Sequence, residues 1–502
     1  MTTVSRLVEA QAQARPEATY FIAAETGCSL TFGEVAGSCA RVRAFLEGKG
    51  LAPGTHVSLV MPNGIATIRI LLGAMSGGYV VNPVNLLSGP EPMRYVLDHS
   101  DCALVFVSPD RASAVREIVG RIGRQIQVVE IDPDARELPG EPVRGNGAAD
   151  VTPDSLALLM YTSGTTGTPK GVMLTHGNVT SNAQIVSDEH RLGPSDRVTA
   201  ILPLYHINAF AVTMLAPLAH GGSLVMPPKF SASQFWTMAS RHRCTWINMV
   251  PTIVSYLLEG PAPPRESIAA IRFCRSASAP LPPEHLLAFQ QKFGIGVIET
   301  MGLTETVAPA FSNPYEPERR KVGSVGRPSG CEAKVVDEKG TERADGEPGE
   351  VVIRGPQVTP GYYKNPAATE GAFFPGGWFR SGDVGLRDAD GFFFITGRIK
   401  ELIIKGGENI APREIDEVLL RHPAVLDAAA VGVPDKHYGQ EVAACVIRRK
   451  GHDCTAEELR EFCTGHLGRF KTPKSIHFVD ELPRGPSGKV QRLKLVDLLL
   501  AA

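Results

Sequence analysis

The chain of 502 residues is long enough for about three domains of ordinary size, each with its own buried core. Its 51 basic and 53 acidic residues nearly cancel, so its charge argues against nucleic acid or an anionic membrane and favours a small-molecule partner. The nine cysteines are odd in number and contain no Cys-x-x-Cys pair, so the sequence predicts neither a disulfide framework nor a zinc site.

The chain also lacks the sequence features of export and membrane insertion. Its first residues, MTTVSRLVEAQAQARPEA, interleave apolar with charged and polar side chains and form no signal-peptide core. No apolar run approaches the length needed to span a membrane. Together with the cysteine pattern, these features predict a cytoplasmic protein without membrane insertion.

Strand-like and helix-like runs alternate through the first three quarters of the chain. The first series, from His56, is HVSLVMP, IATIRILLGAM and YVVNPVN. The rhythm continues in TWINMVP, PTIVSYLLEG, IRFCRSA, PPEHLLAFQQKFG and VIETMG. This alternation predicts parallel sheets covered by helices, with the chemistry in loops that follow strands.

One loop, YTSGTTGTPKG at residues 161–171, combines glycines, hydroxyls and one lysine between a strand-like and a helix-like run. Glycines let successive N–H groups converge on an anion, hydroxyls donate further hydrogen bonds, and Lys170 adds charge, so the loop predicts ATP binding. It departs from the Walker A pattern, because Pro169 precedes the lysine and Gly171 follows it. The expected ATP contacts in this loop are Thr162, Ser163, Gly164, Thr165, Thr166, Gly167, Thr168 and Lys170.

From about Gly323 the sequence changes to short strands separated by Gly and Pro, and a domain boundary is expected near Arg398. Beyond it, APREIDEVLLRH and TAEELREFCTGHL read as helices around two strands. We therefore predict an α/β protein with a large N-terminal domain, residues 1–398, of parallel βα-layered sheets and a β-rich subdomain. A small α+β C-terminal domain, residues 399–502, follows.

Five segments in a fixed order carry a family resemblance. They are the loop at Tyr161, MGLTE at Met301, SGDVG at Ser381, GRIKELI at Gly397 and PSGKVQR at Pro486. In order and spacing they resemble the core motifs of adenylate-forming acyl-CoA synthetases, over most of the chain. The resemblance implies that a carboxylate attacks the α-phosphate of ATP to give an acyl-adenylate, from which coenzyme A then displaces AMP, with Mg²⁺ as the metal.

The resemblance also assigns roles at the phosphates. Lys489 supplies the cation between the carboxylate and the α-phosphate, where negative charge accumulates during attack. Glu305 holds Mg²⁺, a hard cation that prefers oxygen ligands, together with Thr166. Thr304 hydrogen-bonds the α-phosphate.

The resemblance assigns the ribose and the adenine of the nucleotide to other motifs. Asp383 accepts hydrogen bonds from the ribose hydroxyls and Arg398 adds a second contact. The alternatives are that Asp383 caps a turn and that Arg398 forms a surface ion pair. The adenine is expected against Ala277, Ser278, Ala279, Thr300 and Met301, the last covering the ring by dispersion.

Lys400 falls where the family has its interdomain hinge, although a solvated surface lysine is the alternative. The resemblance implies a mobile C-terminal domain that rotates between the two half-reactions. In the second step the segment Gly406, Gly407, Glu408 and Asn409 is then expected to face the site.

Four positions bear on the acid: His206, Arg275, Gly302 and Ala308. His206 borders the acyl pocket in the family, or is a satisfied core histidine. Arg275 lies on a predicted buried strand and must find an anion, supplied by Glu299, by another protein carboxylate or by the substrate.

The RS pair at Arg275, the GRIKELI–GGEN run and the SNP at Ser312 most resemble the oxalyl-CoA synthetase branch, which favours the substrate as that anion. Ala308 and Met301 depart from that branch and favour a longer anionic acid, malonate-like or a sulfonated acetate. The alternatives are a fatty or aromatic acid, an adenylation enzyme that loads a carrier protein, and an ATP-binding pseudoenzyme. A homodimer is compatible with these features.

Overall fold

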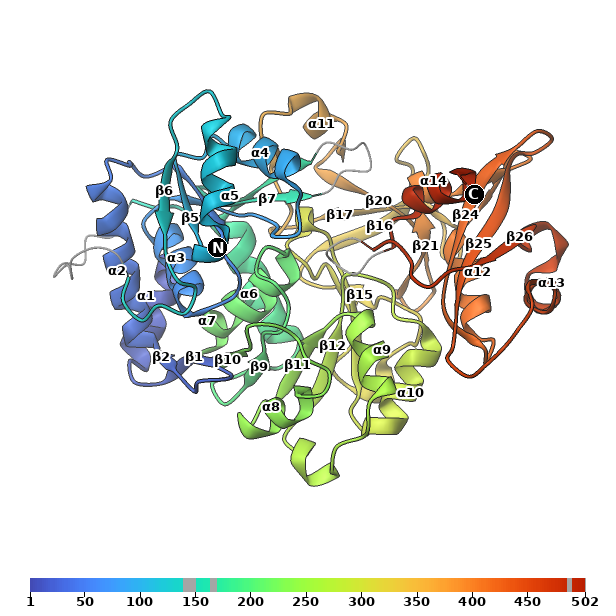
Figure 1. Ribbon diagram of the computed structural model, residues 1–502, viewed down its shortest axis with the longest axis horizontal. Helices are drawn as coiled ribbons and strands as arrows, with labels where there is room; N and C mark the ends of the chain where they lie inside the picture. The colour runs from blue at the N-terminus through green and yellow to red at the C-terminus, as the bar shows by residue number, and fades with distance from the viewer. Residues whose placement is uncertain (139–149, 163–168, 485–489, 502) are drawn as a thin grey trace.

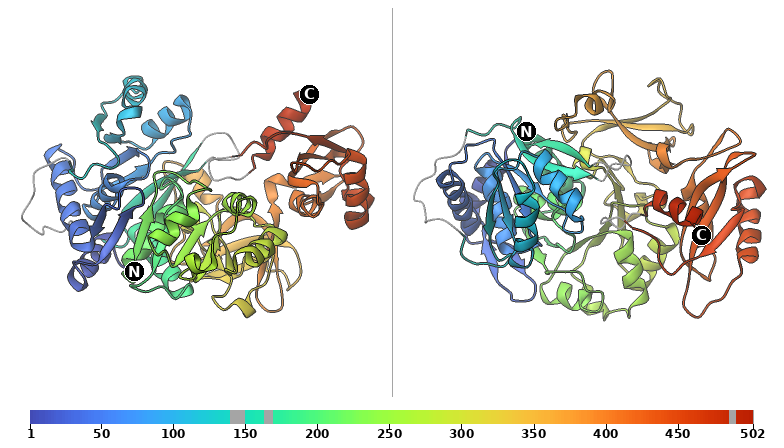
Figure 2. Two further views of the ribbon diagram at one scale, coloured as in Figure 1. Left: turned by 60° about the horizontal axis from the view of Figure 1, so that its bottom comes forward. Right: turned by 45° about the horizontal axis from the view of Figure 1, so that its top comes forward.

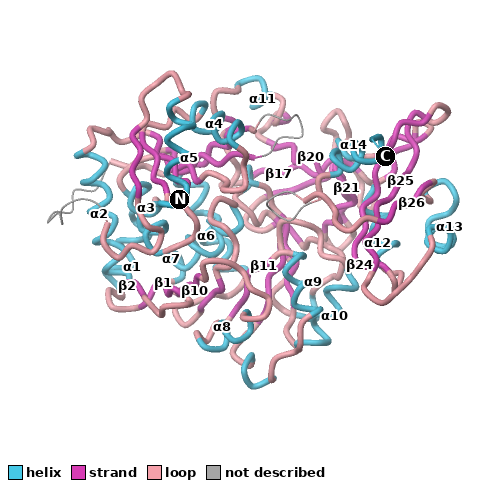
Figure 3. The backbone as a smooth tube through the Cα atoms, in the orientation of Figure 1, coloured by secondary structure: helices cyan, strands magenta, loops and turns pink. Residues whose placement is uncertain are grey.

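The computed structural model describes residues 1–138, 150–162, 169–484 and 490–501, and Figure 1 follows them from the blue N-terminal to the red C-terminal part. Strands form the centre of each layer and helices cover them, as Figure 3 shows by colour. The fold is the expected α/β class, with large parallel sheets, a β-rich region and a smaller C-terminal part.

The largest sheet has nine strands in the order β15-β14-β13-β12-β11-β9-β10-β1-β2. Pairing is parallel from β1 through β10, β9, β11 and β12 to β13, and antiparallel at both edges. The strands are β1 (Thr19–Ala23), β2 (Ser29–Thr31), β9 (Arg197–Thr199), β10 (Ser223–Met226), β11 (Trp246–Met249), β12 (Phe273–Ser276), β13 (Val297–Met301), β14 (Phe311–Ser312) and β15 (Arg327–Pro328).

A second sheet of seven strands, in the order β18-β8-β7-β4-β3-β5-β6, carries the phosphate loop between β7 and β8. The strands are β3 (His56–Val60), β4 (Val80–Pro83), β5 (Leu104–Val107), β6 (Gln127–Glu130), β7 (Leu156–Thr162), β8 (Lys170–Thr175) and β18 (Gly361–Tyr362). The sequence placed a helix directly after the loop, and this is wrong. Strand β8 follows and pairs antiparallel with β7, because KGVMLT supplies a partner for LALLMYT before helix α6 begins.

Two smaller sheets form the later part of the chain. The third contains β16 (Glu332–Val336), β17 (Gly349–Arg354), β19 (Phe373–Phe374), β20 (Trp378–Arg387) and β21 (Phe393–Arg398). The fourth contains β22 (Ile403–Lys405), β23 (Glu408–Ile410), β24 (Val425–Asp435), β25 (Gly439–Arg448) and β26 (Ser475–Phe478). The apolar clusters of this last part contain only residues from Ile403 onward, so it has a core of its own. Both views of Figure 2 show it at one side of the molecule.

The helices follow from apolar patterning and from capping. Helix α3 is buried almost throughout because IATIRILLGAM is mostly apolar, and its Arg69 is hydrogen-bonded to Ser38 at 2.7 Å. Helices α2, α6 and α13 begin at capping boxes of Thr31, Thr175 and Thr455. The α-helices are α1 (Val4–Ala14), α2 (Phe32–Gly48), α3 (Ile65–Ser76), α4 (Pro90–His99), α5 (Pro109–Gly120), α6 (His176–Glu189), α7 (Ala216–His220), α8 (Phe235–Arg241), α9 (Pro251–Glu259), α10 (Pro283–Phe293), α11 (Pro366–Glu370), α12 (Pro412–Leu420), α13 (Ala456–Lys471) and α14 (Arg492–Ala501). The other helices are the π-helix η1 (Asn208–Leu215) and the 3-10 turns η2 (Arg265–Ile268), η3 (Thr304–Thr306), η4 (Pro317–Arg319) and η5 (Ile399–Glu401).

Among the described helices, none is both long enough and apolar enough to cross a membrane.

Candidate active site

The phosphate loop opens from two paired strands. Thr162 at the end of β7 lies opposite Lys170 at the start of β8. Residues 163–168 lie outside the described part of the chain, so the phosphate contacts of Ser163, Gly164, Thr165, Thr166, Gly167 and Thr168 stay predictions. A helix N-terminus would add a partial positive charge at this loop, but strand β8 follows the loop instead. In the described part of the loop, the positive charge is therefore that of the Lys170 ammonium.

Glu305 lies in the turn η3, with Thr304 beside it. Its Oε1 accepts a hydrogen bond of 2.9 Å from the hydroxyl of Tyr362, and its backbone oxygen accepts one of 2.7 Å from the amide of Thr359. The ring of Tyr362 also lies 4.8 Å from the Nζ of Lys170. The predicted metal ligand and the predicted phosphate lysine therefore meet at one tyrosine.

The backbone after Glu305 is strained. Val307 and Ala308 have φ of 57° and 36°, positive values that residues other than glycine rarely adopt, least of all β-branched ones such as valine. Gly302 lies against this turn, and a Cβ on it would be 2.6 Å from the Cα of Ala308. The structure thus brings Gly302 and Ala308 together, and only glycine allows this approach. Such strain gathers at functional sites.

Asp383 and Arg398 lie opposite each other on strands β20 and β21. Arg398 Nε is 2.9 Å from Asp383 Oδ1, and only 6% of the Asp383 side chain is exposed. Asp383 lies within a strand, so the turn-cap alternative is not what the structure has. Burial acts to lower the pKa of Arg398, but Asp383, Glu401 and Glu305 outweigh it and the pKa rises. A nucleotide held here would meet one carboxylate with its cation already in place.

The predicted adenine segment follows the end of β12. Ala277, Ser278 and Ala279 come directly after Ser276, and Thr300 and Met301 end the neighbouring parallel strand β13. The hydroxyl of Thr300 donates to the backbone oxygen of Ser276 at 3.2 Å. The carboxyl ends of adjacent parallel strands are where open α/β sheets bind ligands, which agrees with the predicted role.

Arg275 is fully buried on β12 and has two asparagine partners. Its Nη1 donates to the side-chain oxygens of Asn208 and Asn248, each at 2.7 Å. Among the described residues, its Nε and Nη2 have no hydrogen-bond partner and no carboxylate forms an ion pair with it. Burial lowers the pKa of Arg275 to about 9, so it remains mostly protonated at neutral pH.

Glu299 is not the anionic partner of Arg275, so one of the three candidate anions considered from the sequence is excluded. In the pairing of β12 with β13, Arg275 lies opposite Ile298 and Ser276 opposite Glu299, so the two charged side chains point to opposite faces of the sheet. Glu299 accepts a hydrogen bond from the Leu281 amide at 3.2 Å, and burial raises its pKa to about 7.

His206 lies just before the π-helix η1, which begins with Asn208. The side-chain amide of Asn208 donates to the Ser278 hydroxyl at 3.2 Å, while its oxygen accepts from Arg275. Asn208 therefore links the predicted acyl-pocket segment, the predicted adenine segment and the buried arginine. π-turns inside helices are frequent at functional sites.

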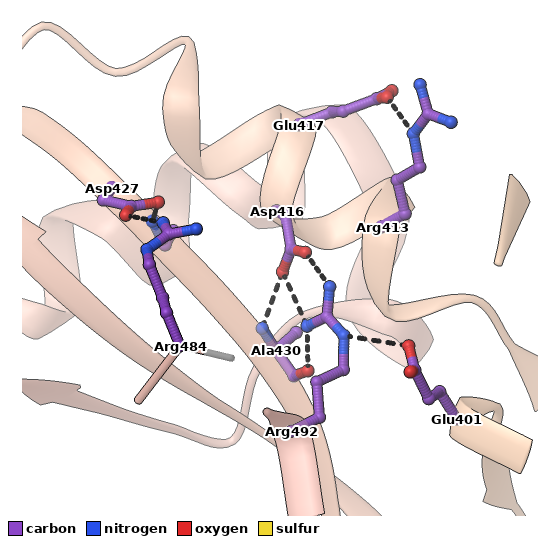
Figure 4. A network of polar contacts seen from close by, with 9 residues as sticks. Glu401, Arg413, Asp416, Glu417, Asp427, Ala430, Arg484 and Arg492 are labelled. Carbon is purple, nitrogen blue, oxygen red and sulfur yellow. Dashed lines mark hydrogen bonds and ion pairs between the residues drawn. The ribbon is translucent and has the colours of Figure 1, made fainter. Parts of the chain in front are cut away.

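Ion pairs join the predicted hinge turn to the residues that flank the predicted catalytic lysine, and Figure 4 shows those of Arg484 and Arg492. Lys400 lies in η5, between β21 and β22. Lys489 lies outside the described residues, but both flanks of its loop are held: Arg484 pairs with Asp427, and Arg492 pairs with Asp416 and, at 3.5 Å, with Glu401 of η5. Arg484 thus contacts the C-terminal sheet, and Arg492 contacts both helix α12 and the turn η5 that carries Lys400.

Gly406 and Gly407 form the turn between β22 and β23, and Glu408 and Asn409 begin β23. Both glycines have positive φ, 57° and 85°, which this tight turn requires. The role of this turn in the CoA step stays a prediction.

Three residues of the site were missed by the sequence reasoning: Tyr362, Asn208 and Asn248. Asn208 stands two positions after His206 and Tyr362 follows PQVTPG, but neither position carries a signal by itself. Their relevance comes from partners more than twenty residues away in sequence, Glu305 and Arg275.

Mg²⁺ fits this donor set. The described residues contain no cluster of three or more metal-ligating side chains, and Glu305 offers one oxygen-only ligand beside the phosphate loop. Mg²⁺ commonly binds through one or two carboxylates plus the phosphates of a nucleotide, so a single carboxylate is sufficient.

Family models match both parts of the chain. Residues 8–363 match the AMP-binding enzymes, and residues 414–489 match the C-terminal domain of AMP-binding enzymes. The chain therefore belongs to the AMP-binding enzyme family, and the predicted resemblance is confirmed.

Individual relatives show which class of enzyme within this family the chain resembles. A sulfoacetate–CoA ligase of Cupriavidus necator is 55% identical over 99% of this chain and 97% of that protein. An oxalate–CoA ligase of Arabidopsis thaliana is 36% identical over 88% of each. The ATP-bound crystal structure of MatB from Rhodopseudomonas palustris superposes with a TM-score of 0.93 at 31% identity, covering 99% of both chains. Within its family the chain is thus one of the AMP-forming CoA ligases, which use ATP, Mg²⁺ and CoA.

Proposed function

We propose that this enzyme joins CoA to a short acid that carries a second negative charge at its far end, with a sulfonated acetate as the best candidate and malonate or oxalate as related ones. The observation that carries the proposal is the charge environment of Arg275. The identity to a sulfoacetate–CoA ligase supports it independently.

The free part of Arg275 has the geometry of an anion receptor. Nη1 is occupied by Asn208 and Asn248, which leaves Nε and Nη2. These two nitrogens form one edge of the planar guanidinium and donate two nearly parallel hydrogen bonds. A carboxylate or sulfonate presents two oxygens at the matching spacing.

The two asparagines orient the guanidinium without neutralising it. An amide oxygen carries no net charge, so Arg275 keeps a buried positive charge that costs several kcal/mol while unpaired. The terminal anion of the acid would relieve that cost on binding. An alkyl or aryl end would leave it in place, which disfavours a fatty or aromatic acid.

In the first half-reaction, an oxygen of the acid's reacting carboxylate forms a bond to the α-phosphorus of ATP, and the bond from phosphorus to the bridging oxygen of pyrophosphate breaks. Lys489 and Thr304 stabilise the charge on the α-phosphate oxygens, and Lys170 holds the phosphates that leave. Mg²⁺, held by Glu305 with Thr166, screens the phosphate charge when bound. Asp383 and Arg398 hold the ribose, and Arg275 fixes the far end of the acid.

In the second half-reaction, the CoA thiolate attacks the acyl carbon and AMP leaves with the bonding electron pair. We place the domain boundary between residues 398 and 399 and the hinge at Lys400, so that rotation replaces Lys489 by the turn at Gly406. The η5 turn, short and lying between two sheets, supports a hinge here. A cytoplasmic location belongs to the proposal, and a homodimer is compatible with it.

The test is a comparison of acids. Sulfoacetate, malonate, oxalate, propionate, hexanoate and benzoate are offered with ATP, Mg²⁺ and CoA, and pyrophosphate and acyl-CoA are measured. We expect a doubly anionic acid to exceed hexanoate in kcat/KM by roughly 100-fold, since it gains a charge-assisted pair. A better rate with hexanoate or benzoate contradicts the proposal. Pyrophosphate release without acyl-CoA would instead favour a carrier protein as the acceptor.

Arg275→Leu tests the residue itself. The variant should raise KM for the doubly anionic acid by roughly 100-fold and leave KM for ATP within about twofold, because the lost contact lies at the acid's far end. Propionate, which lacks the second charge, is the matched control and should lose little. An equal rise in KM for both acids would show that Arg275 does not recognise the second charge.

A further inference from the structure

We propose that Tyr362 is a positioning residue that unites the metal half and the phosphate half of the active site: its hydroxyl aims Glu305 and its ring supports Lys170. The inference rests on the roles of Glu305 and Lys170 in the proposed function. None of the five sequence segments that carry the family resemblance contains this tyrosine.

Tyr362 touches both groups at once. Its side chain is buried, with 8% of the residue exposed, and its hydroxyl donates to Glu305 Oε1 at 2.9 Å. Its ring face lies 4.8 Å from the Lys170 ammonium, within the range of a cation–π contact. The two partners are 135 positions apart in sequence, so the contact between them through one ring is a product of the fold.

The backbone around Tyr362 also links the segments that carry Glu305 and Lys170. The amide of Thr359 donates to the Glu305 backbone oxygen at 2.7 Å on one side. On the other side Tyr362 lies opposite Val172 of β8, and the amide of Tyr363 donates to the Gly171 oxygen at 2.8 Å. This short stretch therefore connects the turn of Glu305 to the strand that begins with Lys170.

The consequence is a metal ligand oriented before the nucleotide arrives. A carboxylate that accepts a hydrogen bond on one oxygen cannot rotate freely, so Oε2 of Glu305 keeps a defined direction. Partners of this kind typically change metal affinity or activity by 10- to 100-fold when removed. The ring of Tyr362 likewise restrains Lys170, whose long side chain otherwise samples many rotamers.

The neighbouring residue provides a matched control. Tyr363 also donates its hydroxyl to a carboxylate, Asp101 Oδ2, at 2.7 Å. Asp101 pairs with Lys364 on the protein surface. Tyr362→Phe and Tyr363→Phe thus remove the same atom and the same type of hydrogen bond, and differ only in which carboxylate is released.

The experiment measures metal binding and not only turnover. Mn²⁺ is titrated into the full-length enzyme with saturating ATP and followed by electron paramagnetic resonance. Tyr362→Phe should weaken Mn²⁺ binding by roughly tenfold or more, while Tyr363→Phe stays within about twofold of the parent. The Mg²⁺ concentration for half-maximal pyrophosphate release should rise in parallel, with KM for the acid unchanged.

Tyr362→Leu separates the ring from the hydroxyl. It should weaken ATP binding measured without metal, in the presence of a chelator, whereas Tyr362→Phe should not, because only the former removes the ring under Lys170. A purely structural role would instead lower the melting temperature of the Tyr362 variants without this division between metal and nucleotide.

Two outcomes overturn the inference: Mn²⁺ affinities of Tyr362→Phe and Tyr363→Phe that agree, or a Tyr362→Phe loss confined to thermal stability. Either leaves the acid preference intact and so contradicts this inference alone. A wild-type enzyme that prefers fatty acids yet shows the Mn²⁺ difference contradicts the proposed substrate alone. Absence of any Mn²⁺–ATP binding by the wild type contradicts both.

Discussion

Arg275 on β12 is fully buried and Arg492 at the start of α14 has only 15% of its side chain exposed, but the surroundings of the two arginines differ in charge. Arg492 meets two carboxylates, Asp416 and Glu401, and the backbone oxygen of Ala430 at 2.6 Å. Arg275 meets two neutral amide oxygens. Burial acts to lower the pKa of both, yet Asp416 outweighs it and raises the pKa of Arg492, while that of Arg275 falls to about 9.

The difference separates a structural ion pair from a binding group. Arg492 has its counter-charge within the protein, so its loss should cost stability. Arg275 has an oriented but uncompensated charge, so its loss should cost substrate binding. A buried charge that the fold orients and does not neutralise is a mark of a ligand site.

The largest expected effect is on stability, from Arg492→Met. It leaves Asp416 buried without its cation, and breaking a buried pair from one side costs roughly 3–5 kcal/mol. Chemical unfolding followed by a probe of the C-terminal part measures the loss. The double variant with Asp416→Leu should recover most of it. Arg448→Met, which removes a surface pair with the fully exposed Asp453, should change stability by less than about 0.5 kcal/mol.

Lys489 stands three positions before Arg492, but Lys489→Ala should slow the first half-reaction and not destabilise the protein. We expect acid-dependent pyrophosphate release to fall roughly 100- to 1000-fold, the usual loss when one group that stabilises developing charge is removed. Thioester formation from a supplied acyl-adenylate should be retained. Equal loss of both half-reactions would contradict the role given to Lys489 and make its loop structural, like Arg492.

Glu299 tests whether Arg275 is truly unpaired. Its pKa is raised to about 7 by burial, so between about pH 4.5 and 7 the folded state holds one proton more than the unfolded chain. This contribution to stability is fully present below about pH 4.5 and is lost as pH rises through 7, by roughly 3 kcal/mol in total. Glu299→Gln should flatten the pH dependence of unfolding free energy over that window. A Glu299 that titrates below 4.5 would instead place a cation beside it.

The smallest effect is expected from Asn248→Asp, which gives Arg275 a carboxylate and makes it resemble Arg492. KM for the doubly anionic acid should rise roughly 10- to 100-fold, because a charge-assisted contact worth about 1.5–3 kcal/mol is taken from the substrate. Stability should stay within about 1 kcal/mol. In an Arg275→Leu background the same substitution should have no further effect on KM, since no guanidinium remains to be neutralised.

The sequence predicted the architecture because its signals are local. Apolar runs of strand length alternating with helical runs predicted β11, α9, β12, α10 and β13 in order, and each is present. The helix expected directly after the phosphate loop was wrong, because β8 and β7 pair by backbone hydrogen bonds that no single run reveals.

The same distinction between local sequence signals and long-range contacts applies to the candidate active site. Motif order identified the AMP-binding family, and a charged residue in an apolar strand identified Arg275 as a residue in need of an anion. The strand register then decided that Glu299 faces away from it. Register is a property of two strands together, so no inspection of either strand alone reveals it.

The chain by itself therefore determined the fold class, the family and the residue types that ATP chemistry needs, since these depend on patterns within short segments. Only the tertiary structure decided which partners those residues have: the asparagines that hold Arg275, the carboxylates that neutralise Arg492, and the tyrosine between Glu305 and Lys170. These contacts join segments far apart in sequence, and the free energy of a buried charge depends on what the folded chain places next to it.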